Sequence, residues 1–141
     1  MATFDIIHAG TLCGTWSGAH HRLPHRPGFP WPIRTVEHPR GNDPSIVYTD
    51  AEKRQLQVHN QFFDFTFQVF NGAGKSSAKT IVGLENPAAR TGISSMFHTQ
   101  EAEELRRHSF ALDYVFDQCE YGLSYKKATQ VLTNGAMTNL L

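Results

Sequence analysis

Residues 92–119, GISSMFHTQEAEELRRHSFALDYVFDQC, contain a change in the spacing of their apolar side chains. Before His98 apolar and polar residues alternate, which is the period of a β-strand. After His98 apolar residues recur every three to four positions, which is the period of an α-helix. No strand-like segment follows the helical one. This order of elements predicts an α+β protein, with C-terminal helices packed on an antiparallel sheet, rather than a βαβ arrangement.

The helical part divides into two predicted helices, near residues 99–121 and 124–133. Thr99 can cap the first helix, because its hydroxyl can accept a hydrogen bond from a free first-turn amide. Acidic residues follow directly after Thr99 and complement the positive end of a helix dipole. Gly122 is a suitable residue to end the first helix. The apolar tail, which ends in Leu140 and Leu141, predicts packing on a core or on a partner.

Residues 33–98 supply the predicted antiparallel sheet, and an irregular N-terminal hairpin precedes it because prolines crowd residues 24–32. Its most regular predicted strand is residues 54–70. In that strand the apolar positions change from even to odd between His59 and Phe62. Because a one-residue slip turns every side chain over, the chain must bulge or turn there. The opposite face of the second half is polar and carries Asp64, Thr66 and Gln68.

The composition of the 141-residue chain is that of a globular protein, and its length fits a single domain, residues 1–141. The apolar runs are only a few residues long, so we expect no membrane span. The N-terminus lacks a basic region followed by an apolar one, so we expect no secretion signal. Cys13 and Cys119 are too few for a disulfide framework, which favours a reducing compartment.

The net charge is zero, but the charges are unevenly distributed. Residues 1–98 contain nine Lys or Arg and seven Asp or Glu, so the predicted strand part is the more basic one. This distribution permits an anionic partner on the sheet without requiring one.

Residues 71–76, NGAGKS, look like the end of a nucleotide-binding P-loop. The full motif needs a glycine five residues before Gly74, where this chain has Val69. It also needs a helix to follow, whereas residues 79–84 resemble a strand. A hairpin loop is therefore the preferred interpretation of this segment.

His20, His21 and His25, with Cys13 nearby, are soft metal ligands by type. Their spacing matches no zinc motif, so we expect a solvated loop, no metal and no cofactor. No catalytic motif is present, and nothing in the sequence supports an enzyme. A histidine-based metalloenzyme remains the third hypothesis for the function.

The tripeptide Gly14-Thr15-Trp16 resembles the Gly-x-Trp motif near the start of lipocalin-like barrels. This makes a small barrel that binds an apolar small molecule the alternative hypothesis, with Trp16 at the barrel floor. The prolines that follow and the shortage of later strands count against closure of an eight-stranded barrel.

The order of an irregular hairpin, a meander of strands and two helices, the first beginning TQEAEE, resembles the coat proteins of single-stranded RNA bacteriophages (levivirus-like). The similarity covers residues 44–132, and these proteins have a similar length and often the same Met-Ala start. Residues 10–32 depart from the pattern. The resemblance implies a capsid protein of the virion. Its intertwined homodimers would place their helices over each other's sheets, assemble into an icosahedral shell and bind RNA on the inner sheet face.

No motif fixes RNA-contacting residues, so the candidates follow from the predicted strand faces and from charge. A basic, partly aromatic sheet can bind phosphates by charge and unpaired bases by stacking. The predicted RNA-binding residues are Lys53, Arg54, His59, Thr66, Gln68, Lys75 and Lys79.

Overall fold

The computed structural model describes residues 6–16, 32–76, 80–107, 112–122, 124 and 127–134. The strands are β1 (Ile6–Gly10), β2 (Ile81–Pro87), β3 (Leu112–Asp117) and β4 (Ala128–Thr133). The α-helices are α1 (Asp50–Ser76) and α2 (Gln100–Arg107), and the short 3-10 helices are η2 (Met96–His98) and η3 (Gln118–Tyr121). The predicted α+β class is therefore confirmed.

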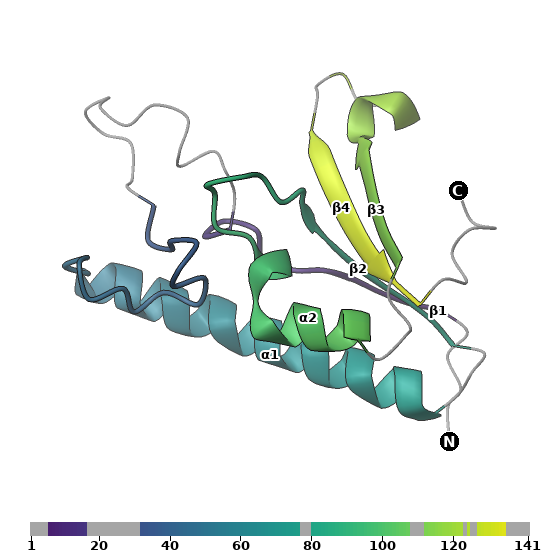
Figure 1. The fold of residues 1–141 in the computed structure, drawn as a ribbon, viewed down its shortest axis with the longest axis horizontal. Helices are drawn as coiled ribbons and strands as arrows, with labels where there is room; N and C mark the ends of the chain where they lie inside the picture. Colours follow the sequence, from purple (N-terminus) through teal and green to yellow (C-terminus); the bar gives the residue numbers. More distant parts are fainter. Residues whose placement is uncertain are drawn as a thin grey trace.

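The four strands form one mixed sheet in the order β1-β2-β4-β3. Strands β1 and β2 run parallel, whereas β4 is antiparallel to both β2 and β3. Helix α1 connects the two parallel strands, and both helices lie on the same side of the sheet (Figure 1). The fully antiparallel sheet predicted from the sequence is wrong, because β1, α1 and β2 make a βαβ unit.

Helix α1 occupies residues 54–70, where the sequence analysis predicted a strand. A capping box begins the helix: the Glu52 backbone N–H donates to Thr49 Oγ1 over 3.3 Å, and the Thr49 backbone N–H donates to Glu52 Oε2 over 2.8 Å. The buried apolar residues recur at helical spacing on one side of the helix. They are Leu56, Phe63, Phe67 and Phe70. The odd-numbered phenylalanines that suggested a strand thus divide between two faces of a helix.

The C-terminal half is mostly strand, not helix. Helix α2 ends at Arg107, where the first predicted helix extends to residue 121, and β4 replaces the predicted helix 124–133. Only the start of α2 agrees with the prediction, because Thr99 Oγ1 accepts from the Ala102 backbone N–H over 3.3 Å. Strands β3 and β4 pair in register instead, so that alternate side chains share a face.

Three smaller predictions are also wrong. Residues 71–76 form the last turns of α1 instead of a hairpin loop. Within the sheet predicted over residues 33–98, residues 33–49 are turns and irregular segments, and residues 92–98 form a turn followed by η2. The predicted strand at residues 79–84 is confirmed in part by β2.

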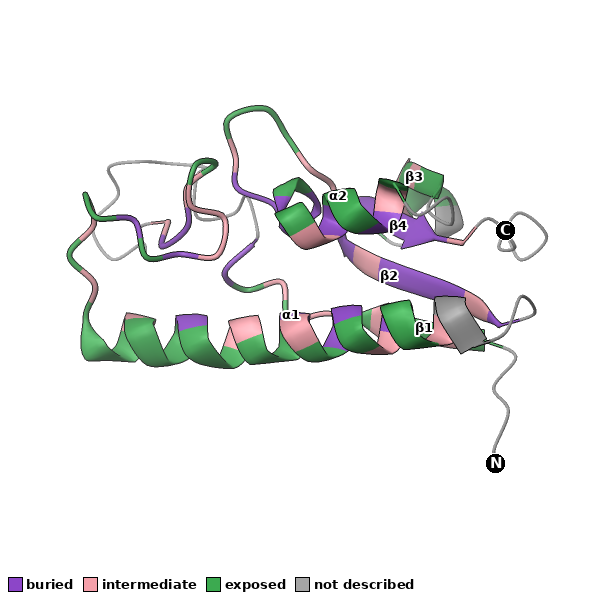
Figure 2. Cartoon of the chain, turned by 60° about the horizontal axis from the view of Figure 1, so that its bottom comes forward, coloured by how far each residue is buried: buried purple, intermediate pink, exposed green. Residues whose placement is uncertain are grey.

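The core lies between the helices and one face of the sheet. Phe63 and Phe67 of α1 and Leu105 of α2 pack against Leu84 of β2 and Leu132 of β4. Figure 2 shows that the buried positions of α1 gather on its side toward the sheet, whereas its other side is exposed along the helix. Among the helices that the structure describes, none combines the length and apolar character that a membrane span requires.

Candidate functional site

The most unusual side chain of the described chain is Arg34, which is only 1% exposed. The guanidinium carbon lies 3.8 Å from the centre of the Trp16 ring. Arg34 Nε donates to Thr15 Oγ1 over 2.9 Å, and Nη1 donates to the Pro39 carbonyl over 2.8 Å. The third nitrogen, Nη2, is buried and has no hydrogen-bond partner in the described part of the chain. None of the ion pairs between described residues includes Arg34.

The segment that holds Arg34 is fixed by its own turns. The Gly41 backbone N–H donates to the His38 carbonyl over 2.9 Å. Gly41 has a φ of +83°, and a Cβ at this position would come within 2.8 Å of the Leu56 side chain. Only glycine fits both this left-handed backbone and this close approach to α1. The turn therefore brings the chain next to Arg34 tightly against the helix.

Thr15 links Arg34 to His59 of α1, because Thr15 Oγ1 lies 2.9 Å from His59 Nδ1. Burial, followed by the charge of Arg34, lowers the pKa of His59 from its ordinary value, which favours the neutral form of the ring. The Thr15 hydroxyl accepts a hydrogen bond from Arg34 Nε and shares a second hydrogen bond with His59 Nδ1, whose direction depends on the tautomer of the ring. The result is a chain of hydrogen bonds that joins Arg34, Thr15 and His59.

Burial also acts on Arg34 itself. It lowers the pKa of Arg34 to about 9, with the like charge of Arg40 adding to the effect and Tyr48 opposing it. The guanidinium still carries its proton at pH 7, since arginine loses it only at high pH. The centre made by Thr15, Trp16, Arg34 and His59, called here the Arg34 centre, thus contains a buried positive charge that has no carboxylate partner among the described residues.

The outer side of α1 is the second feature that suggests a function. Apolar side chains recur there at residues 58, 62, 65 and 69, and they lie nearly opposite the row that faces the core. The exposed fractions are 44% for Val58, 53% for Phe62 and 64% for Phe65. Val69 is half-buried and, with Phe65, lines a hollow of about 160 Å³ between α1 and β1. We call these four residues the outer row.

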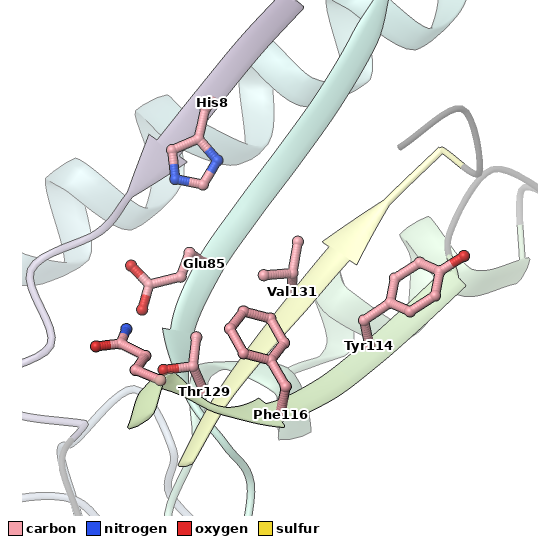
Figure 3. A pocket seen from close by; sticks show the side chains of 7 residues that line it. His8, Glu85, Tyr114, Phe116, Thr129 and Val131 are labelled. Atoms are coloured by element: carbon pink, nitrogen blue, oxygen red, sulfur yellow. The ribbon is translucent and has the colours of Figure 1, made fainter. Parts of the chain in front are cut away.

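A third feature is a hollow of about 290 Å³ on the sheet face opposite the helices. Figure 3 shows side chains of all four strands around it: His8 of β1, Glu85 of β2, Tyr114 and Phe116 of β3, and Thr129 and Val131 of β4. Lys127 Nζ lies 3.5 Å from Glu85 Oε1, so the carboxylate of this hollow already has a cationic partner.

The predicted RNA-binding residues do not share a sheet face. Lys53, Arg54 and Gln68 are exposed on α1, and the buried Thr66 donates its hydroxyl to the Phe62 carbonyl over 2.8 Å. His59 belongs to the Arg34 centre instead. The side chain of Lys75 and all of Lys79 lie outside the described residues, as do His20, His21 and His25. The residues that the structure describes contain no group of three His, Cys, Asp or Glu side chains that could hold a metal ion.

The sequence analysis missed Arg34 because its partners are distant in the chain. Thr15 is 19 positions away from Arg34, and the Thr15–His59 contact spans 44 positions. Comparison of the chain with protein-family models, curated proteins and solved structures finds no match. The function must therefore be argued from these three features.

Proposed function

We propose that the protein is a self-associating structural protein whose building block is a homodimer. The observation that supports this is the outer row of α1, where Phe62 and Phe65 are more than half exposed on a helix already packed on the core by its other side. Isolated exposed apolar residues are common, but a row of them at helical spacing is typical of an interface.

A second copy of the chain suits this row better than an unrelated partner. The spacing of residues 58, 62, 65 and 69 alternates between four and three, which allows two identical helices to interdigitate. The positions beside the two phenylalanines are Gln61 and Gln68, which are exposed and uncharged. Two copies can therefore approach in a symmetric pair without opposing like charges at the centre of the contact.

The expected strength of the contact is modest. Burying the exposed half of Val58, Phe62 and Phe65 on each copy stabilises a dimer by about 1 kcal/mol per side chain, or about 6 kcal/mol in all. This gain is close to the lower limit of the cost of association, about 4 kcal/mol or more. A stable dimer therefore needs additional contacts, which β1 can supply because it is an edge strand with Ile6 51% exposed.

Capsid assembly and RNA binding are the narrower form of this proposal. The coat-protein resemblance relied on a long strand at residues 54–70, and that segment is a helix. An intertwined dimer with helices over the partner's sheet is therefore replaced by a dimer that pairs through α1. The features that still support a shell are self-association and two exposed cations on the first turns of α1, Arg54 and Lys53, of which Lys53 also lies 3.8 Å from Asp50 Oδ1.

The test is the oligomeric state of the full chain, measured by size exclusion with light scattering and by electron microscopy. We expect a dimer that dissociates on dilution, and Phe65→Gln should weaken it roughly thirtyfold, since two side chains are lost per dimer. Closed particles would support the capsid form of the proposal. Dimers without particles would support the structural role and contradict the capsid.

Val47→Gln is the matched control, because Val47 is 97% exposed and lies outside α1. This change removes an exposed apolar side chain without touching the outer row, so the dimer should persist. A parent chain that remains monomeric at all concentrations would contradict the proposal. A dimer equally weakened by both changes would mean that the interface lies elsewhere.

Binding of an apolar small molecule, the alternative hypothesis, is also testable. The described strands form an open sheet with β1 and β3 at its edges, and Trp16 is buried against Phe63 of α1. The place for a small molecule is therefore the hollow lined by Phe116 and Val131 and not a barrel interior. Saturable binding of an environment-sensitive dye that Val131→Asp abolishes would support this alternative.

A further inference from the structure

The charge of Arg34 is not balanced by any described residue. A guanidinium removed from water costs several kcal/mol unless it is paired and hydrogen-bonded. In this protein two of its three nitrogens are hydrogen-bonded to uncharged oxygens, Thr15 Oγ1 and the Pro39 carbonyl. The stacked Trp16 ring returns part of the lost solvation through its π electrons, at most about 2 kcal/mol. A bound anion would remove the remaining imbalance of charge.

The geometry also leaves a nitrogen for that anion. Arg34 Nη2 is buried and without a hydrogen-bond partner among the described residues, so its N–H groups are unsatisfied. The guanidinium cannot turn to solvent, because Trp16, Thr15 and Pro39 hold three sides of it. A fixed arginine with one unpaired nitrogen is a preorganised anion-binding group.

We propose that Arg34 binds a singly charged oxyanion group, a carboxylate or a phosphodiester, through Nη2. A single negative charge matches the single unpaired positive charge of the Arg34 centre. Arg40 is not available as a second cation, because Asp64 and Glu101 already pair with it. Thr15 and His59 are positioning residues, since the hydrogen-bond chain through Thr15 Oγ1 fixes the plane of the guanidinium. This inference is independent of self-association.

The test is thermal unfolding of the full chain at constant ionic strength, with chloride replaced stepwise by acetate in one series and by dimethyl phosphate in another. A ligand that binds only the folded chain raises its melting temperature in a saturable way. We expect a rise of a few degrees with at least one of the two anions. A larger rise with acetate identifies a carboxylate ligand, and a larger rise with dimethyl phosphate identifies a phosphodiester. No rise with either anion would overturn the proposal.

Two variants assign the effect to Arg34. Arg34→Met keeps the length of the side chain without the charge, and its melting temperature should not respond to either anion. Arg107→Met removes a charge from an exposed position at the end of α2, and its response should equal that of the parent. A response that persists in Arg34→Met would overturn the proposal, because the anion would then bind at another position.

A second measurement keeps Arg34 in place and so does not depend on the folding of its variants. The chain has two tryptophans, Trp16 and Trp31, and Trp31→Phe leaves Trp16 as the only one. Because the Arg34 guanidinium lies 3.8 Å from the Trp16 ring, neutralising its charge should shift the emission of Trp16. The emission should change with the same midpoint as the stabilisation. An emission unaffected by a stabilising anion would contradict binding at Arg34.

Discussion

Arg34 and Arg40 are six positions apart and contact the same aromatic cluster, but their charges are balanced differently. Arg34 lies over Trp16 and Arg40 over Phe63, and these two rings are 5.7 Å apart. Arg40 Nη1 is 2.7 Å from Asp64 Oδ1 of α1 and 2.7 Å from Glu101 Oε1 of α2. Arg34 has no carboxylate partner in the described residues.

The pKa values of the two arginines move in opposite directions for this reason. The hydrogen bond that Arg40 donates to Asp64 raises the pKa of Arg40 above its ordinary value, outweighing partial burial, whereas burial lowers the pKa of Arg34. The charge of Arg40 is balanced by its contacts, which join α1 to α2. The contacts of Arg34 leave its charge unexplained, and this difference separates a structural arginine from a candidate binding residue.

The largest expected effect comes from removing the aromatic side chain at the centre of this cluster. Phe63 is 1% exposed and contacts Trp16, Phe67 and Arg40. Phe63→Ala should destabilise the fold by about 3–5 kcal/mol, measured by urea unfolding, because it leaves a cavity. Phe65→Ala, two positions away and 64% exposed, should cost about 0.5 kcal/mol or less in the monomer. Equal losses would mean that α1 is rotated from the orientation described.

The next-largest expected effect is a gain in folding stability when Arg34 is replaced by an uncharged side chain. Arg34→Met should leave the folded chain more stable in chloride buffer, by about 1 kcal/mol, because removing an unpaired buried charge outweighs two hydrogen bonds to neutral groups. Urea unfolding of the parent and variant measures the difference. A loss above about 2 kcal/mol would show that Arg34 is needed for folding and that its charge is balanced.

The failed part of the fold prediction is instructive at α1. Residues 63, 65, 67 and 69 are apolar at alternate positions, as in a strand. The same residues also fit two apolar rows on a helix: residues 63 and 67 face the core, and residues 65 and 69 face outward. Period alone cannot separate these cases when a helix has two apolar faces. The capping box Thr49–Glu52 is the local signal that favours the helix, and it stands in the sequence as T-x-x-E.

The C-terminal part failed for a different reason. Leu112 and Phe116 continue the 3-4 spacing of α2, so the helix prediction ran through them, although β3 begins at Leu112. In β4, Thr129, Val131 and Thr133 are β-branched residues at alternate positions, which is the local signal that favours a strand. The site could not be predicted at all, because Arg34, Thr15 and His59 meet only through tertiary contacts.

The same substitution at Arg40 should have the opposite effect on stability to that at Arg34. Arg40→Met should destabilise the fold by about 1 kcal/mol, because the ion pairs with Asp64 and Glu101 are partly exposed and screened by water. The loss should shrink at high salt, where the parent's pairs are weaker. Urea unfolding at low and high salt measures both effects. A salt-independent loss would indicate that the contact with the Phe63 ring, and not the ion pairs, supplies the stability.

The smallest expected effect is a pH dependence of stability that arises from His59 and that distinguishes Arg34 from Arg40. The pKa of His59 in the folded chain lies below 6.5, from burial and then from the charge of Arg34. The unfolded chain therefore binds this proton first as the pH falls, so stability present above pH 6.5 decreases below it, down through the folded pKa. His59→Gln should lose this part of the pH dependence, measured by urea unfolding between neutral and mildly acidic pH. Arg34→Met should reduce it, since the repelling charge is gone, whereas Arg40→Met should leave it unchanged. If Arg40→Met alters the pH dependence as much as Arg34→Met does, the two arginines act on His59 as one charged group and the distinction between them fails.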